Sequence, residues 1–338
     1  MFGKLRMPGT LGLLSLAMVA LVACGGSGGG EGGEKVTLTA GHQLANDTPF
    51  DKGLNRFAKL VDEKTDGQVE VQVQPNAQLG DEPEMFQAMQ EGTQDVAVVA
   101  PGSIGEFAPE INILALPFQI TSREQRDTVI NGEVGDRMSK LLEEDTGVRI
   151  IGYFGGGVRN MFFTEPAESQ EDIQGRLFRV QPSDVLTKSF GAVGLEPTVV
   201  DYTELYNALE QGVVDGAENE SVFVLSQKFY EPAPHLLLTE HEVTIRPLML
   251  STATLDRLSE EQVDAVLEAG TEASEYERRI EAEEDDAALQ TLQEEHDVTA
   301  TKVDKAPMIK AVDPVATDFA EEYGLEDVLQ QIQDARTE

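Results

Sequence analysis

Hydrophobic and polar positions follow two regular patterns over the first hundred residues. Residues 36–40 and 69–73 alternate with the period of a β-strand, and residues 96–100 form a short apolar run. Between these strands, residues 50–64 and 85–90 carry apolar side chains at helical spacing. The order strand, helix, strand, helix, strand predicts a parallel α/β sheet.

The rest of the chain predicts a second sheet and several helices. Residues 123–144 are predicted as one helix, and residues 148–153 as the strand that follows it. Further strands are predicted at residues 178–180, 196–200 and 243–251, with a helix at residues 202–211. Two sheets built from about 300 residues predict two α/β lobes.

A long helix is predicted near the C-terminus. Ser259-Glu260-Glu261-Gln262 has the form of a capping box, and the helical pattern that it opens continues to about residue 296. Gly270 is the predicted place for a bend, because glycine weakens a helix interior. An amphipathic segment over residues 312–331 is the last predicted element.

The N-terminal segment predicts export. Two cations precede an apolar run at residues 11–22 that is too short to span a bilayer, so residues 1–23 are predicted as a lipoprotein signal peptide. Leu21-Val22-Ala23-Cys24 resembles a lipobox, which implies a lipid anchor on Cys24; a stray cysteine is the alternative. Cys24 is the only cysteine, so no internal disulfide can form. Residues 24–35, rich in glycine and serine, predict a flexible tether to the membrane.

The charge of the chain narrows the range of partners. With 62 acidic and 25 basic residues, the formal net charge is −37. This charge argues against nucleic acid and anionic lipid surfaces as partners. A saline habitat and an ordinary acidic secreted protein both explain it. Residues 146–164 hold no acidic residue but include Arg149 and Arg159, and they mark a place where an anion can approach.

The chain offers little of the chemistry of catalysis. Its four histidines are scattered without metal-ligand spacing, and no phosphate loop, dinucleotide fingerprint or Gly-x-Ser-x-Gly motif occurs. We therefore expect no metal, no cofactor and no enzymatic activity. The strand ends of the first predicted sheet instead place Gln43, Glu82 and Ser103 near one crevice, where α/β proteins bind ligands.

An ordered set of short motifs runs through the chain. Its members are Pro75-x-x-Gln78-Leu79-Gly80, Leu116-Pro117-Phe118, Gly157-x-Arg159-Asn160, Asp172-Ile173-Gln174-Gly175-Arg176-Leu177-Phe178-Arg179-Val180 and Gly212-x-Val214-Asp215-Gly216-x-Glu218-Asn219. Over residues 36–335 this set resembles the substrate-binding proteins of tripartite ATP-independent periplasmic (TRAP) transporters. The resemblance implies an α/β, two-lobe periplasmic-binding-protein-like fold with hinge strands and a long C-terminal helix that braces both lobes. We place lobe one at residues 36–156 plus 245–284, and lobe two at residues 157–244 plus 285–338.

The resemblance also implies which residues bind the ligand. Arg179 matches the arginine that clamps the substrate carboxylate, a role that suits its planar, two-pronged guanidinium; a structural arginine at a strand end is the alternative. Arg159 matches a second arginine of the pocket. Asn219 falls in a matched Glu-Asn pair, and Tyr202 matches an aromatic residue that packs against the ligand, with a place in the core as its alternative.

Arg246 lies in a second stretch without acidic residues, residues 243–255. A third arginine in the cleft would suit a ligand with a second carboxylate or with many hydroxyls, whereas an edge-strand arginine is the alternative. Three buried positive charges repel one another unless they meet more than one acceptor. We expect Glu82 to supply part of that compensation and the ligand the remainder, which favours a diacid or a sugar acid over a short monocarboxylate.

The expected function is that of an extracytoplasmic solute-binding lipoprotein. It would capture a small organic acid, a sugar acid or a dicarboxylate, by cleft closure and deliver it as a monomer to the integral-membrane subunits of a TRAP transporter. A sensory lipoprotein that presents ligand to a receptor is the alternative. A hydrolase of the same fold comes third, because the sequence offers no pair of nucleophile and base. Which acid binds is left open.

Overall fold

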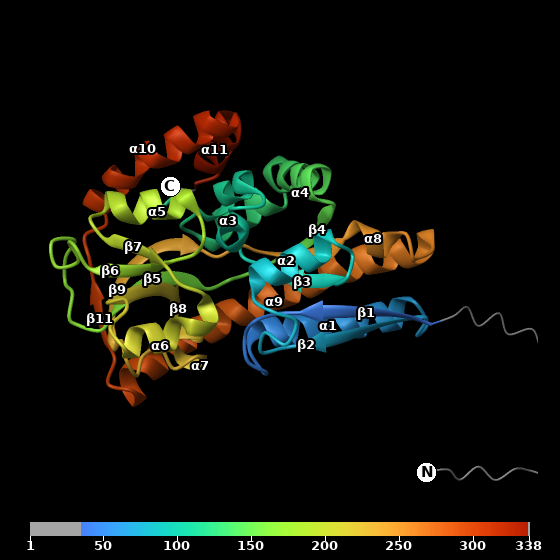
Figure 1. Cartoon of the computed structure of the whole chain (residues 1–338), viewed down its shortest axis with the longest axis horizontal. Coiled ribbons are helices and arrows are strands. Elements are labelled where there is room, and N and C mark those ends of the chain that lie inside the picture. Colours follow the sequence, from blue (N-terminus) through green and yellow to red (C-terminus); the bar gives the residue numbers. More distant parts are fainter. Residues whose placement is uncertain (1–34, 337–338) are drawn as a thin grey trace, which may run out of the picture. The chain divides into compact units, whose positions relative to one another are not determined.

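The computed structural model describes residues 35–336, and two β-sheets form the framework of this part of the chain (Figure 1). The first sheet has the order β2-β1-β3-β10-β4, and the second has the order β11-β9-β5-β8-β6-β7. The strands of the first sheet are β1 (Val36–Gly41), β2 (Val69–Gln74), β3 (Val96–Val98), β4 (Val148–Phe154) and β10 (Arg246–Ser251). The strands of the second are β5 (Val158–Phe163), β6 (Leu177–Val180), β7 (Glu196–Val199), β8 (Gly216–Glu220), β9 (His235–Val243) and β11 (Thr299–Lys302).

The predicted α/β class is confirmed, although the first sheet is only partly parallel. Strand β1 pairs parallel with β2 and β3, as the alternation of strands and helices predicts. Strand β10 comes from much later in the chain and pairs antiparallel with β3 and β4. The predicted strand over residues 243–251 is in fact divided between two sheets, because the chain leaves β9 at Val243 and enters β10 at Arg246.

Helices cover both sheets. They are α1 (Pro49–Lys64), α2 (Glu82–Gln90), α3 (Arg123–Ile130), α4 (Glu133–Thr146), α5 (Asp184–Ala192), α6 (Leu205–Glu210), α7 (Ser221–Ser226), α8 (Thr252–Leu255), α9 (Glu260–Glu295), α10 (Ala306–Tyr323) and α11 (Glu326–Asp334), with short 3₁₀ helices η1 (Pro101–Ile104), η2 (Pro109–Ala115) and η3 (Tyr202–Glu204). The single helix predicted over residues 123–144 is two helices, because the turn formers Asn131 and Gly132 end α3 and begin α4. The last predicted helix is likewise divided at Gly324, which ends α10 in the left-handed conformation.

Helix α9 is the long predicted helix, and it packs against elements of both sheets (Figure 1). It contacts strand β4 of the first sheet, helix α1, which follows β1 of that sheet, and helix α7, which follows β8 of the second sheet. The predicted capping box is present, since the Ser259 side chain accepts from the Gln262 backbone N–H. The helix runs without interruption through Gly270, where a Cβ atom would lie 2.5 Å from the Ile151 carbonyl oxygen. Gly270 therefore lets β4 approach the helix closely.

The chain crosses from the first sheet to the second at residues 155–157, between β4 and β5. Three acidic residues of α9 at four-residue spacing, Glu277, Glu281 and Asp285, face this crossing from one side of the helix. We call them the carboxylate ladder. They accept the backbone N–H groups of Gly155 (2.8 Å), Gly156 (2.9 Å), Gly157 (2.8 Å) and Val158 (2.9 Å) in turn. The ladder thus holds four consecutive residues of the crossing by their backbone.

The carboxylate ladder is buried, and burial favours the neutral form of a carboxyl group. Burial, the nearby charge of Glu281 and a hydrogen bond that protonated Glu277 donates to Glu281 raise the pKa of Glu277 well above its ordinary value. Burial also raises the pKa of Asp285 to about 7. Glu277 Oε1 and Glu281 Oε2 are buried and accept no hydrogen bond from the described residues. We infer that these two side chains share a proton.

Replacing Glu277 with glutamine should therefore stabilise the protein at about pH 8. The glutamine oxygen can accept from the Gly155 N–H, as Glu277 does. The glutamine NH₂ group can donate to Glu281 in place of the proton that Glu277 carries. A carboxyl whose pKa is raised by folding contributes stability that is lost as pH rises, so the wild type should weaken from about pH 5 to pH 8. Glu277→Gln should gain on the order of 1 kcal/mol at pH 8 in denaturant unfolding and show a flatter pH profile. Glu275→Gln, exposed on the same helix, is the control; an equal change there would contradict the shared proton.

Helix α10 has its two ends in different hydrophobic cores. Met308 and Val312 pack with Phe163 and Phe178 in a core of the second sheet. Further along α10, Ala316, Phe319 and Ala320 pack in the large core that contains Met249 of β10. Pro314 lies inside the helix between these two groups. Helix α11 then packs against α3 and α4, which sequence analysis placed in lobe one. The lobe boundaries stay a prediction.

Candidate ligand-binding site

A small polar cavity that suits a small molecule lies where residues from both sheets meet. All eight residues expected from the sequence line it, namely Gln43, Glu82, Ser103, Arg159, Arg179, Tyr202, Asn219 and Arg246. Six further residues line the cavity that were not among the expected site residues, namely Leu44, Phe50, Ala100, Gln181, Glu220 and Phe223.

Arg179 is the arginine of the cavity whose charge has no carboxylate partner. It lies on β6 and is 3% exposed. Its Nε donates to the Val200 carbonyl oxygen at 2.8 Å, and its guanidinium lies 5.6 Å from the centre of the Tyr202 ring. Between residues 35 and 336, no carboxylate oxygen lies within 4.0 Å of the Arg179 guanidinium. Burial lowers the pKa of Arg179, so the site has a positive charge that an anionic ligand could stabilise.

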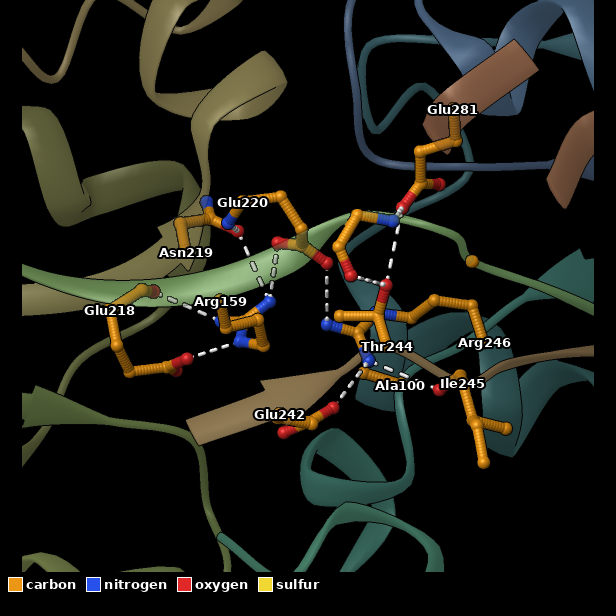
Figure 2. A network of polar contacts seen from close by, with 12 residues as sticks. Ala100, Arg159, Glu218, Asn219, Glu220, Glu242, Thr244, Ile245, Arg246 and Glu281 are labelled. Carbon is orange, nitrogen blue, oxygen red and sulfur yellow. Dashed lines mark hydrogen bonds and ion pairs between the residues drawn. The ribbon is translucent and has the colours of Figure 1, made fainter. Parts of the chain in front are cut away.

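Arg159, in contrast, is fully engaged by the protein (Figure 2). Its Nε donates to the Glu218 carboxylate, and its Nη1 donates to Glu220 at 2.6 Å and to the Asn219 side-chain oxygen at 3.1 Å. Its Nη2 donates to the Glu218 carbonyl oxygen at 2.9 Å. Although burial alone would raise the pKa of Glu218, the Arg159 charge and a hydrogen bond from His241 hold that pKa well below its usual range.

Arg246 is also neutralised within the protein. Its Nη2 donates to Glu220 Oε1 at 3.2 Å, and its Nη1 lies 3.5 Å from Glu242 Oε1. The expectation that the ligand must compensate three arginines is therefore wrong, because Glu218, Glu220 and Glu242 supply most of that charge. The sequence does indicate that Glu218 and Glu220 lie on the same face of a strand, since they are two positions apart. It does not indicate that this face is buried against the arginines.

Gln43, Glu82 and Ser103 form a hydrogen-bonded group whose polar atoms could also pair with hydroxyl groups of a ligand. Glu82 accepts from the Gln43 side chain at 2.9 Å, from the Ala100 N–H at 3.1 Å and from Ser103. Burial raises the pKa of Glu82 despite these donors.

Asn219 and Tyr202 are coupled to each other, since the Asn219 amide donates to the Tyr202 hydroxyl at 2.9 Å. The Tyr202 ring also packs edge-on against Phe229, with ring centres 5.5 Å apart. Tyr202 packs against the core and also lines the cavity, so its contact with the ligand stays a prediction.

Two further findings concern the part of the chain that the structure describes. Over residues 35–336, no group of three or more His, Cys, Asp or Glu side chains is placed to hold a metal ion. None of the helices in these residues combines the length and the apolar character needed to cross a membrane. Cys24, the signal peptide and nearly all of the tether lie outside the described residues.

A cavity lined by arginines from two α/β sheets, with chain crossings between the sheets, defines a two-lobed α/β ligand-binding protein. More specifically, the chain belongs to the bacterial extracellular solute-binding proteins of family 7, whose model matches residues 40–322. This confirms the resemblance to the substrate-binding proteins of TRAP transporters.

Similar proteins have been described and solved. A solute-binding protein of Sulfitobacter sp. (strain NAS-14.1) is 34% identical over 285 residues, which cover 84% of this chain and 86% of that protein. A TRAP periplasmic solute binding protein from Sulfitobacter sp. NAS-14.1 with bound α-D-taluronate has 33% identity and a TM-score of 0.85, covering 88% of this chain and 97% of the other. One from Chromohalobacter salexigens with bound D-glucuronate has 32% identity and a TM-score of 0.84, covering 88% of this chain and 100% of the other.

Proposed function

We propose that this protein captures a sugar acid outside the cytoplasm and delivers it to the membrane subunits of a TRAP transporter. The observation that carries the proposal is the state of Arg179, which is buried in the cavity without a carboxylate partner among the described residues. A planar guanidinium in that position can donate two parallel hydrogen bonds to a ligand carboxylate.

The other contacts favour one carboxylate and several hydroxyls over two carboxylates. Arg159 and Arg246 are already held by glutamates, so a second ligand carboxylate would compete with Glu220 for them. Gln43, Glu82 and Ser103 present amide, carboxyl and hydroxyl groups that can pair with sugar hydroxyls. The relatives solved with taluronate and glucuronate support this choice. A dicarboxylate remains the alternative ligand.

The test is a binding screen by thermal shift, followed by calorimetry. D-glucuronate and D-galacturonate should bind at least tenfold more tightly than succinate or lactate, since only the sugar acids offer both a carboxylate and hydroxyls. A ligand at about one hundred times its Kd should stabilise the protein by about 2.7 kcal/mol. D-glucose, which lacks the carboxylate, is the control and should not bind. Tighter binding of succinate would replace the sugar acid with a dicarboxylate, and a panel without any binder would overturn the proposal.

The location and the partner are further parts of the proposal. The protein would be held at the outer side of a membrane by a lipid on Cys24, which mass spectrometry of the mature N-terminus tests. A sensory lipoprotein of the same fold stays the alternative to transport. Genes for small and large membrane subunits beside this gene would favour transport, whereas an adjacent sensor kinase gene would favour signalling.

A further inference from the structure

Seven ionisable side chains at the cavity form a buried charge cluster. They are Arg159, Arg179, Arg246, Glu82, Glu218, Glu220 and Glu242, and each is at most 6% exposed. With all seven ionised, three positive charges face four negative ones. A ligand carboxylate adds a further negative charge beside these buried side chains. Because an excess of buried negative charge is costly, uptake of a proton by the cluster would favour binding of the anion.

The ion pairs show which carboxylates are in excess. Glu218 and Glu220 are bound to Arg159, and Glu220 also contacts Arg246. If Arg179 takes the ligand carboxylate, each of the three arginines has an anion. Glu82 and Glu242 are then the surplus carboxyl groups of the buried charge cluster.

Of these two, Glu242 has the poorer environment for an anion. Glu82 accepts hydrogen bonds from Gln43, Ala100 and Ser103, which favour its ionised form. The Glu242 side chain accepts no hydrogen bond from residues 35–336, and its Oε1 is buried without a hydrogen-bond partner there. Its one cation within 4.0 Å in this part of the chain is Arg246 at 3.5 Å.

Arg246 is also shared between two glutamates. Figure 2 shows Glu242 and Glu220 on either side of the Arg246 guanidinium. The other charged or titratable groups near Glu242 are Arg159, Glu218 and Glu220 from the neighbouring strands and His241 on its own strand. Two of these groups repel the Glu242 anion, while Arg159 already serves Glu218 and Glu220.

We propose that the protein binds its anionic ligand together with a proton, which Glu242 takes up as the ligand enters. The inference rests on the proposed function. Glu242 does not line the cavity, so it acts behind Arg246 rather than as a ligand contact. A neutral Glu242 no longer forms an ion pair with Arg246. The Arg246 charge can then interact more strongly with the ligand anion.

The protonation of Glu242 sets the direction of the pH dependence. Burial, opposed by Arg246 and Arg159, raises the pKa of Glu242 to about 7 in the free protein. The ligand charge raises that pKa further, so the complex holds the proton more tightly than the free protein does. Affinity is then greatest below about pH 7, and above it Kd weakens by up to about tenfold per pH unit.

The experiment is calorimetry of D-glucuronate binding at about pH 8 in phosphate and in Tris. These two buffers differ in their heat of protonation, so the difference in binding heat counts the protons exchanged. The wild type should take up close to one proton and should bind about tenfold or more weakly at pH 8.5 than at pH 6.5. Binding of the sugar acid with equal heats in both buffers would overturn the proton uptake and leave the proposed function intact.

Two variants locate the proton. Glu242→Gln imitates the neutral side chain, so proton uptake should disappear and binding at pH 8.5 should be about tenfold tighter than in the wild type. A purely structural role would predict weaker binding at every pH instead. Glu240→Gln, exposed on the same strand and paired with Lys305, is the matched control and should keep the wild-type pH profile.

The remaining outcomes also decide the matter. If Glu242→Gln still takes up a proton, the acceptor is another group such as Glu82 or His241, and the assignment to Glu242 is wrong. If Glu242→Gln does not fold, the proton count of the wild type alone confirms or overturns the uptake. If no acid of the panel binds, the proposed function has failed and this inference fails with it.

Discussion

Replacing Arg179 with alanine should weaken sugar-acid binding by roughly 30-fold to several thousand-fold, or about 2–5 kcal/mol. The ligand carboxylate would lose the cavity arginine that no carboxylate of residues 35–336 holds. Arg179→Lys should be nearly as harmful, because a single ammonium cannot reproduce two parallel hydrogen bonds. Calorimetry with D-glucuronate measures both variants against the wild type.

The control for Arg179 is Arg149→Ala, which removes an equal charge from β4 at a half-exposed position paired with Glu143. Its binding should match that of the wild type. Thermal unfolding of each ligand-free variant checks that it folds. If Arg179→Ala binds within threefold of the wild type while remaining folded, Arg179 does not clamp the ligand.

Replacing Gly155 with alanine should destabilise the protein by on the order of 3 kcal/mol or more. Gly155 has a φ of 98°, and an added Cβ atom would lie 2.6 Å from the Thr244 carbonyl oxygen. The position therefore combines backbone strain with a clash against a second backbone segment, and neither can relax without moving a crossing between the sheets. A fall in Tm of roughly 5–10 °C is the expected result in a thermal melt.

Gly212→Ala separates the two causes. Gly212 has a φ of 69°, yet no atom lies within 4 Å of the position where its Cβ would stand. This variant should therefore show only the cost of the left-handed conformation, about 1 kcal/mol. Equal losses at Gly155 and Gly212 would mean that the contact with Thr244 does not matter.

The local elements of the fold could be predicted from the sequence because their signals lie within a few residues. The Ser259 capping box and the amphipathic face of α1 are examples. The break at Asn131-Gly132 was missed because the polar and apolar pattern continues across it. The pairing of β10 joins residues about 150 positions apart with β3 and about 100 positions apart with β4, and no local pattern specifies it.

The candidate site was predicted as a set of residues but not as a charge balance. Resemblance and strand-end positions located all eight expected residues at one cavity. The partners of Arg159 lie about 60 positions away on β8, and they look like ordinary surface glutamates in a chain rich in acids. The same holds for Glu277 and Glu281, whose burial depends on the crossing that α9 covers. Sequence alone gives the types of charged residue, while the packing decides which of them are buried together.

Helix α10 has its two halves in different cores, on either side of Pro314. The core that holds its second half contains residues of both sheets, such as Met249 and Val243. If the two sheets separate when the cavity empties, we therefore expect the contacts of α10 to change or the helix to bend. Pro314 is the place for that bend, since it donates no backbone hydrogen bond. The fraction of closed molecules then scales the apparent affinity. Packing at buried positions such as Phe319, outside the cavity lining, would then affect how much ligand is needed to fill the site.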